Sequence, residues 1–163
     1  WVIDTNLWGV IYGCHVFVPR LKTQGFGKVL NIASAAGLLN PPNLSSYNVA
    51  KAGVIALSET LFAELENTGV GITVVCPTFF KTSLLSSARM TRNDLKETAE
   101  KVFSRSRSSA EEIARRSIEA LEKNEFYVVP NLDGKLLWQF KRTAPRQFLK
   151  LAKRLNDKLL MRD

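Results

Sequence analysis

Two apolar runs separated by a helical segment constrain the fold of this 163-residue chain more than any other feature. Residues 28–34 and 71–76 are the apolar runs, and their length and composition predict buried strands. Residues 47–67 predict a helix that ends at Thr68 and Gly69. Strands joined by such a crossover lie parallel, with a right-handed connection, so the order predicts an α/β fold. Because residues 28–34 are apolar on both faces, we expect them at the centre of the sheet.

The stretch before the first strand also predicts a helix, over residues 2–21. Its apolar stripe at helical spacing consists of Trp8, Ile11, Tyr12, His15, Val16 and Pro19. We expect His15 to be half-buried in this stripe, and we expect Pro19 to kink or end the helix. Gly25 and Gly27 then predict a turn into the strand.

The segment between the first strand and the long helix predicts a loop over residues 35–44. Ser45 or Ser46 is expected to cap the helix that follows. The packing face of that helix is expected to contain Val49, Gly53, Ala56, Leu57, Thr60 and Leu61.

The second half of the chain contains fewer clear elements. Residues 83–109 are polar and rich in Ser and Arg, which fits either a solvated, partly helical loop or a mobile lid. Residues 109–123 predict a helix with a capping signature at Ser109. Residues 126–129 predict a third strand, and Asp133-Gly134 predicts a turn.

Composition excludes some classes of protein and indicates a compartment. No apolar run approaches the ~20 residues that a membrane-spanning helix needs, and no signal peptide is visible. Cys14 and Cys76 lie in apolar patterns, which favours buried free thiols and a cytoplasmic location. The sequence begins at Trp1 rather than Met, so we expect a fragment of a longer protein.

The positive charge lies almost entirely in the tail. Residues 1–134 contain 14 Lys/Arg and 13 Asp/Glu, whereas residues 135–163 contain 9 Lys/Arg and 2 Asp/Glu. After a break at Pro145, an apolar stripe surrounded by basic residues predicts an amphipathic helix; the stripe consists of Phe148, Ala152, Leu155 and Leu159. This helix would pack on its own domain or on a partner, or contact an anionic membrane surface as a peripheral element. We expect no nucleic-acid binding, because no aromatic stacking pattern accompanies the charge.

Tyr47 and Lys51 form the pair of residues with the clearest chemical potential. Four residues apart, they share one face of the predicted helix. An ammonium beside a phenol favours the phenolate and would lower the phenol's pKa. Such a phenol can act as a general acid or base near neutral pH.

The context of this pair resembles the short-chain dehydrogenase/reductase family over about residues 1–130. The matching pieces are Asn6 in an N-L-x-G segment, Ser34 at the end of an N-I-x-S strand, the Y-x-x-x-K pair and the P-x-x-x-x-T loop from Pro77 to Thr82. The resemblance implies a three-layer, doubly wound, Rossmann-like parallel sheet. It also implies a chain that is the catalytic half, residues 1–134, without the amino-terminal dinucleotide-binding half.

The resemblance implies a role for each of these residues. Tyr47 would be the acid/base, Ser34 would hydrogen-bond the substrate oxygen, and Asn6 would hold a water that relays protons to Lys51. Lys51 would lower the pKa of Tyr47 and hold the nicotinamide ribose. Thr82 would steady the nicotinamide carboxamide.

The resemblance also has implications for the cofactor site, including the loop from Pro77 to Thr82 and the dinucleotide-binding half of the family's domain. The resemblance places Asn6, Tyr47, Lys51, Pro77, Thr78 and Thr82 at an NAD or NADP cofactor, and it implies no metal. Thr78 stands where the family usually has glycine, which bears on how closely the loop approaches the cofactor. Neither a strand with a Gly-rich turn nor the residue that distinguishes NAD from NADP is present in the sequence.

We therefore expect an NAD(P)-dependent oxidoreductase that interconverts an alcohol and a ketone or aldehyde. The alternative is a non-catalytic domain that acts in dimerisation or at a membrane surface. The resemblance also implies a homodimer or tetramer, formed through helices 2–21 and 47–67. Aromatic and aliphatic residues near the motifs hint at a small apolar alcohol or ketone as substrate; they are Phe79, Phe80, Leu84, Trp138 and Phe140.

Overall fold

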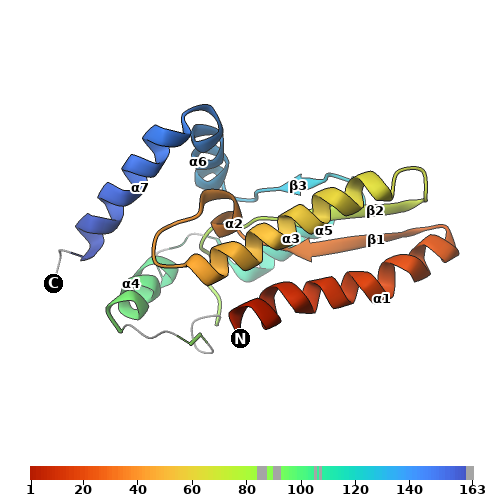
Figure 1. The fold of residues 1–163 in the computed structure, drawn as a ribbon, viewed down its shortest axis with the longest axis horizontal. Coiled ribbons are helices and arrows are strands. Elements are labelled where there is room, and N and C mark those ends of the chain that lie inside the picture. Colours follow the sequence, from red (N-terminus) through yellow and green to blue (C-terminus); the bar gives the residue numbers. More distant parts are fainter. Residues whose placement is uncertain (84–87, 90–92, 105, 107, 161–163) are drawn as a thin grey trace.

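A parallel sheet forms the centre of the fold, as the sequence predicts. A computed structural model describes residues 1–83, 88–89, 93–104, 106 and 108–160. Within these residues the strands are β1 (Gly27–Ile32), β2 (Val70–Val75) and β3 (Tyr127–Val128), in the order β1-β2-β3. Both pairs are parallel, and Gly27 of β1 lies opposite Val70 of β2 (Figure 1).

The central strand of the described sheet is β2, not β1, so the expected central position of residues 28–34 is wrong here. Ile72 and Val74 of β2 pack towards the helices formed from residues 9–24 and 45–64. Val75 packs with Ala120 on the opposite face. β1 pairs on one side only among the described strands, and Ile32 is 49% exposed.

The first helix begins with a π-helical turn, η1 (Asp4–Trp8), and continues as α1 (Gly9–Gln24). Pro19, which was expected to kink or end the helix, lies inside α1 and does not end it. The buried face is formed by Cys14 and Val18, which pack in a cluster with residues of β2. The predicted stripe instead faces outwards, and both His15 and the 62%-exposed Tyr12 lie in solvent.

A short helix occupies part of the predicted loop. This helix, α2 (Ala35–Leu39), is capped by Ser34, whose Oγ accepts a hydrogen bond from the Ala36 amide at 3.1 Å. Gly37 permits its contact with the next helix, since a Cβ there would lie 2.6 Å from the carbonyl carbon of Lys51. The loop prediction is therefore wrong for residues 35–39.

The long helix, α3 (Ser45–Glu64), has Leu44 at its N-cap and no side-chain cap, so neither Ser45 nor Ser46 caps it as expected. Its buried face also differs from the prediction and consists of Ala50, Lys51, Val54, Ile55, Ser58 and Leu61. Val49 is exposed. Gly53 lies against η1, because an added Cβ would be 2.8 Å from the side chain of Leu7.

The remaining helices cover the second sheet face and extend the molecule. They are α4 (Asn93–Ser104), α5 (Ala110–Glu122), α6 (Leu132–Thr143) and α7 (Pro145–Leu160). The expected cap of α5 is confirmed, because Ser109 Oγ accepts from the Glu112 amide at 3.2 Å. Asp133-Gly134 is not an isolated turn but part of the first turn of α6.

α6 leads away from the sheet, and α7 turns back along the end of the molecule where α4 lies (Figure 1). Within the part of the chain that the structure describes, no helix combines the length and apolar character needed to cross a bilayer. Cys14 and Cys76 are buried free thiols, as expected.

Candidate active site

The predicted site residues gather at the carboxyl ends of β1 and β2. Ser34 follows β1, and the loop from Pro77 to Thr82 follows β2. Backbone hydrogen bonds hold these two ends together, from Ala33 N to Val75 O at 2.8 Å and from Ala35 N to Pro77 O at 2.9 Å. Ligands bind at this edge of open parallel α/β sheets.

Ser34 and Tyr47 lie close enough for the Ser34 side chain to lower the pKa of the Tyr47 phenol. The extended backbone of Ser34, with φ −167° and ψ 154°, places it at the start of α2. Helix α2 packs closely on α3 at Gly37. This packing brings the Ser34 side chain near the first turn of α3, where Tyr47 lies. The two residues that the sequence analysis assigned to one site therefore lie near each other.

The electrostatic setting of Tyr47 differs from the expectation. Burial raises the pKa of the Tyr47 phenol above its ordinary value, and the neighbouring Ser34 side chain acts in the opposite direction. The predicted lowering of this pKa by Lys51 is wrong for this structure. The Lys51 ammonium lies 5.7 Å from the centre of the Tyr47 ring and donates to the Ile32 carbonyl at 3.0 Å.

Lys51 is a buried cation, with 8% of its surface exposed. Burial lowers the pKa of its ammonium, while the neighbouring Cys76 acts in the opposite direction. Burial also raises the pKa of the Cys76 thiol to about 12, so this thiol stays protonated at neutral pH and is not a nucleophile. The polar centre of the site is therefore Ser34, Tyr47 and Lys51.

Asn6 is on a neighbouring element but bonds within its own turn. Its Nδ2 donates to the Val2 carbonyl at 3.2 Å. It lies in η1, a π-helical turn of the kind that recurs at functional sites. The contact of Leu7 with Gly53 places η1 against α3, two residues after Lys51.

The loop after β2 is held by residues that the sequence analysis did not assign to the site. The Thr78 amide donates to Asn131 Oδ1 at 3.1 Å, and Thr78 Oγ1 donates to the Asp133 carboxylate at 3.3 Å. Asn131 Nδ2 in turn donates to Ser108 Oγ at 3.2 Å. The sequence analysis assigned Asp133 only to a turn and gave Asn131 no role.

Aromatic residues near the site have different surroundings. Phe79 packs edge-on against Phe103, with ring centres 5.2 Å apart, whereas Trp138 packs on Tyr127 and Phe140 packs on Phe148. Leu84 lies outside the described residues, and Thr82 is exposed.

Two hollows accompany the described loop, and Tyr47 lines neither. An apolar hollow of about 250 Å³ lies between the sheet and α5, with Ile32, Pro77 and Phe80 in its wall. Another of about 250 Å³ lies between the loop and α4, lined by Lys81, Thr82, Glu100, Phe103 and Ser104. The described residues place no metal-binding cluster of His, Cys, Asp and Glu at either one.

The sequence profile of the short chain dehydrogenase family matches residues 1–93. The chain belongs to this family. It is 37% identical over 93 residues to 2-dehydro-3-deoxy-L-rhamnonate dehydrogenase (NAD(+)) of Sphingomonas, covering 57% of this chain and 37% of that protein. It is 31% identical over 138 residues to the putative oxidoreductase SadH of Mycobacterium tuberculosis, covering 82% and 50%.

Solved structures of the family show the same fold. A short chain dehydrogenase from Burkholderia phymatum, crystallised with NAD, superposes with a TM-score of 0.80 at 29% identity, covering 88% of this chain and 57% of that one. A short-chain dehydrogenase from Streptomyces avermitilis gives a TM-score of 0.71 at 22% identity, covering 96% and 61%. The Rossmann-like fold is thus confirmed, and the chain spans about half the length of the curated relatives and solved structures it matches.

Proposed function

We propose that the protein containing this chain is an NAD(P)-dependent oxidoreductase that interconverts an alcohol with a ketone or aldehyde. The observation that carries the proposal is the proximity of the Ser34 side chain to the Tyr47 phenol at the edge of the sheet where ligands bind. The buried Lys51 ammonium lies one helical turn from the phenol. The family relationship adds support, because dehydrogenases are among the relatives.

The raised pKa of Tyr47 suits the donation of a proton. A buried phenol stays neutral at pH 7 and can donate its proton to a carbonyl oxygen held beside it. Ser34 would hydrogen-bond the same oxygen and stabilise the charge that develops there. In the reverse direction Tyr47 would accept the proton of an alcohol.

The residues present fit the nicotinamide end of a dinucleotide. Lys51 has a buried ammonium suited to ribose hydroxyls, and the loop from Pro77 to Thr82 lies at the same strand ends. When bound, the nicotinamide would supply or accept the hydride. Thr78 would shape its approach, because its side chain is fixed to Asp133 rather than absent as in a glycine.

We propose a small apolar alcohol or ketone as substrate. The phenylalanines of the loop and of α4 favour an apolar surface beside the site. A relative with 40% identity over 85 residues, covering 52% of this chain and 34% of that protein, is named cyclohexanol dehydrogenase, from Acinetobacter. The buried free thiols fit our proposal of a cytoplasmic location.

The test is turnover by the full-length protein, with NADH and NADPH and a panel of apolar ketones and aldehydes. Tyr47→Phe removes the proton donor and is expected to remove most activity, by about 10²- to 10⁴-fold. Tyr12→Phe is the matched control, because Tyr12 is exposed on the far side of α1. Full turnover in Tyr47→Phe would refute the assignment.

The outward faces of α1 and α3 favour a homodimer or tetramer. The exposed large apolar residues are Trp8 at the end of η1, Tyr12, Val16 and Phe17 on α1, and Val49 and Phe62 on α3. Helices 2–21 and 47–67 would pair with the same helices of a second copy, whether or not the protein is catalytic. Light scattering on the purified protein tests this, and Phe17→Glu is expected to shift the mass towards the monomer.

A further inference from the structure

Helix α7 exposes apolar and cationic side chains along the same stripe. Leu151, Arg154, Leu155 and Lys158 recur at helical spacing and therefore share one face. All of them are exposed, and Leu151 and Leu155 are 39% and 52% exposed. Leu149 is exposed as well. These leucines are therefore not buried in the core and remain available for contact.

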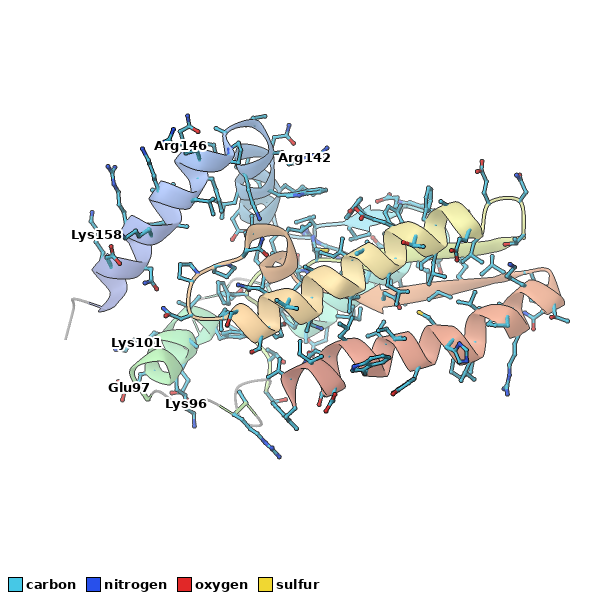
Figure 2. The ribbon with its side chains drawn as sticks, in the orientation of Figure 1. Lys96, Glu97, Lys101, Arg142, Arg146 and Lys158 are labelled. Atoms are coloured by element: carbon cyan, nitrogen blue, oxygen red, sulfur yellow. The ribbon has the colours of Figure 1, made fainter. Side chains whose placement is uncertain are left out.

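Among the described residues, no ion pair neutralises the positive charge of α7. The helix contains Arg146, Lys150, Lys153, Arg154 and Lys158 against Asp157. The ion pairs found among the described residues join Arg115 to Glu119 and Arg116 to Glu112, all within α5. Arg146 and Lys158 point away from the body of the molecule (Figure 2).

The body of the protein holds α7 in this orientation. Phe148 is buried, with its ring 5.9 Å from that of Phe140 on α6. Asn43 Nδ2 donates to Asn156 Oδ1 at 2.7 Å. Lys141 of α6 donates to the Leu38 carbonyl at 2.6 Å. Helix α7 is therefore docked on its own domain. This docking buries only part of the apolar surface of the helix and leaves the stripe exposed.

We propose that α7 binds the surface of an anionic lipid bilayer, lying in the plane of the interface. Exposed leucines bordered by Lys and Arg match what such a surface offers, which is acyl chains beneath negative headgroups. The cations contribute additively through charge complementarity, and the leucines supply the shallow insertion. A nucleic acid fits less well, because the aromatic residue of α7 is the buried Phe148 and no ring is left for base stacking.

The experiment is co-sedimentation of the full-length protein with vesicles. Vesicles of phosphatidylcholine alone are compared with vesicles that also contain phosphatidylglycerol. Binding is expected only to the anionic vesicles, and it should weaken as salt is added, because exposed charges are screened. Equal binding to both vesicle types, or no binding to either, would overturn the proposal.

Two double variants separate the contributions of charge and apolar surface. Arg154→Gln with Lys158→Gln should weaken binding to the anionic vesicles by on the order of tenfold or more. Arg20→Gln with Lys22→Gln is the matched control, because it removes the same charge from exposed positions on α1 and should leave binding nearly unchanged. If both pairs weaken binding equally, net charge alone is responsible and the assignment to α7 fails.

Leu151→Gln with Leu155→Gln keeps every charge and should also weaken binding. Light scattering without lipid is the companion measurement for this variant. An unchanged mass is expected. A smaller mass than that of the unchanged protein would show that the leucines join two copies of the chain, which would overturn the bilayer assignment.

Discussion

Helix α3 and the tail formed by α6 and α7 use lysine in opposite ways. Lys51 is buried in α3, where its ammonium is fixed by the Ile32 carbonyl beside Tyr47. Lys158 and its neighbours on α7 are exposed and point to solvent. The effect of a buried cation depends on its position. Solvent screens each exposed cation, so the effect of exposed cations depends on their total charge. Single substitutions should therefore matter in α3 and matter little in the tail.

The sharpest test of this difference removes one cation from each region. Lys51→Met should lower kcat/KM by about 10²- to 10⁴-fold, because the acid/base residue loses its charged neighbour. Lys135→Met, at an exposed position on α6, should leave kcat/KM unchanged. The measurement is steady-state kinetics of the full-length protein. Similar losses in both variants would contradict the distinction.

A second test separates chemistry from helix capping. Ser34→Ala removes both the partner of Tyr47 and the cap of α2, so we expect a loss of about 10²-fold in kcat together with about 1 kcal/mol of stability. Ser109→Ala removes an equivalent cap from α5 without touching Tyr47. It should cost similar stability with little change in kcat. Kinetics and denaturant unfolding on the same samples measure both effects.

Cys76, the buried neighbour of Lys51, should also affect how the free energy of unfolding depends on pH. Burial raises the pKa of Cys76 from 9.0 to about 12, so the folded state binds more protons than the unfolded state between these values. The stability from this thiol is complete below pH 9 and is lost as pH rises towards 12.

Cys76→Ala should therefore remove part of the fall in unfolding free energy above pH 9, by at most about 4 kcal/mol. Unfolding by urea at a series of pH values measures this. The control is the same variant near pH 7, where its cost reflects packing alone. A parallel pH profile in the variant and the unchanged protein would contradict the assignment to Cys76.

The smallest expected effect comes from the close packing behind the site. Gly37→Ala would place a Cβ 2.6 Å from the backbone of Lys51, so α2 must shift, at a cost of about 1–3 kcal/mol. Gly13→Ala meets nothing within 4 Å and should stabilise α1 by up to about 1 kcal/mol. Thermal unfolding measures the change in stability of both variants. Equal changes would show that the close approach of Gly37 to α3 does not affect stability.

The sequence was sufficient for the existence of the strands and for assigning Ser34 and Tyr47 to one neighbourhood. Both depend on local patterns, namely apolar runs and a motif at fixed spacing. The buried faces of α1 and α3 were not predictable in the same way, because both helices have apolar residues on two sides. In α1 the larger residues Tyr12 and Phe17 face outwards, while Cys14 and Val18 are buried.

Other features depend on contacts between distant parts of the chain. The Asn131 and Asp133 contacts to Thr78 join residues 53 and 55 positions apart, and no local pattern encodes them. The raised pKa of Tyr47 also required the structure, because burial is its largest cause and the motif does not indicate burial. Whether the apolar side chains of α7 lie in the core or on the surface likewise depends on their exposure. The spacing of these residues in the sequence does not determine that exposure.

The one-sided pairing of β1 has a consequence for how this chain behaves in solution. Along its outer edge, amide and carbonyl groups have no strand beside them among the described residues. An open edge of this kind is a template for intermolecular strand addition. The 163-residue chain, purified by itself, should therefore form edge-to-edge oligomers at high concentration, and any polypeptide that supplies a neighbouring strand should keep it dispersed.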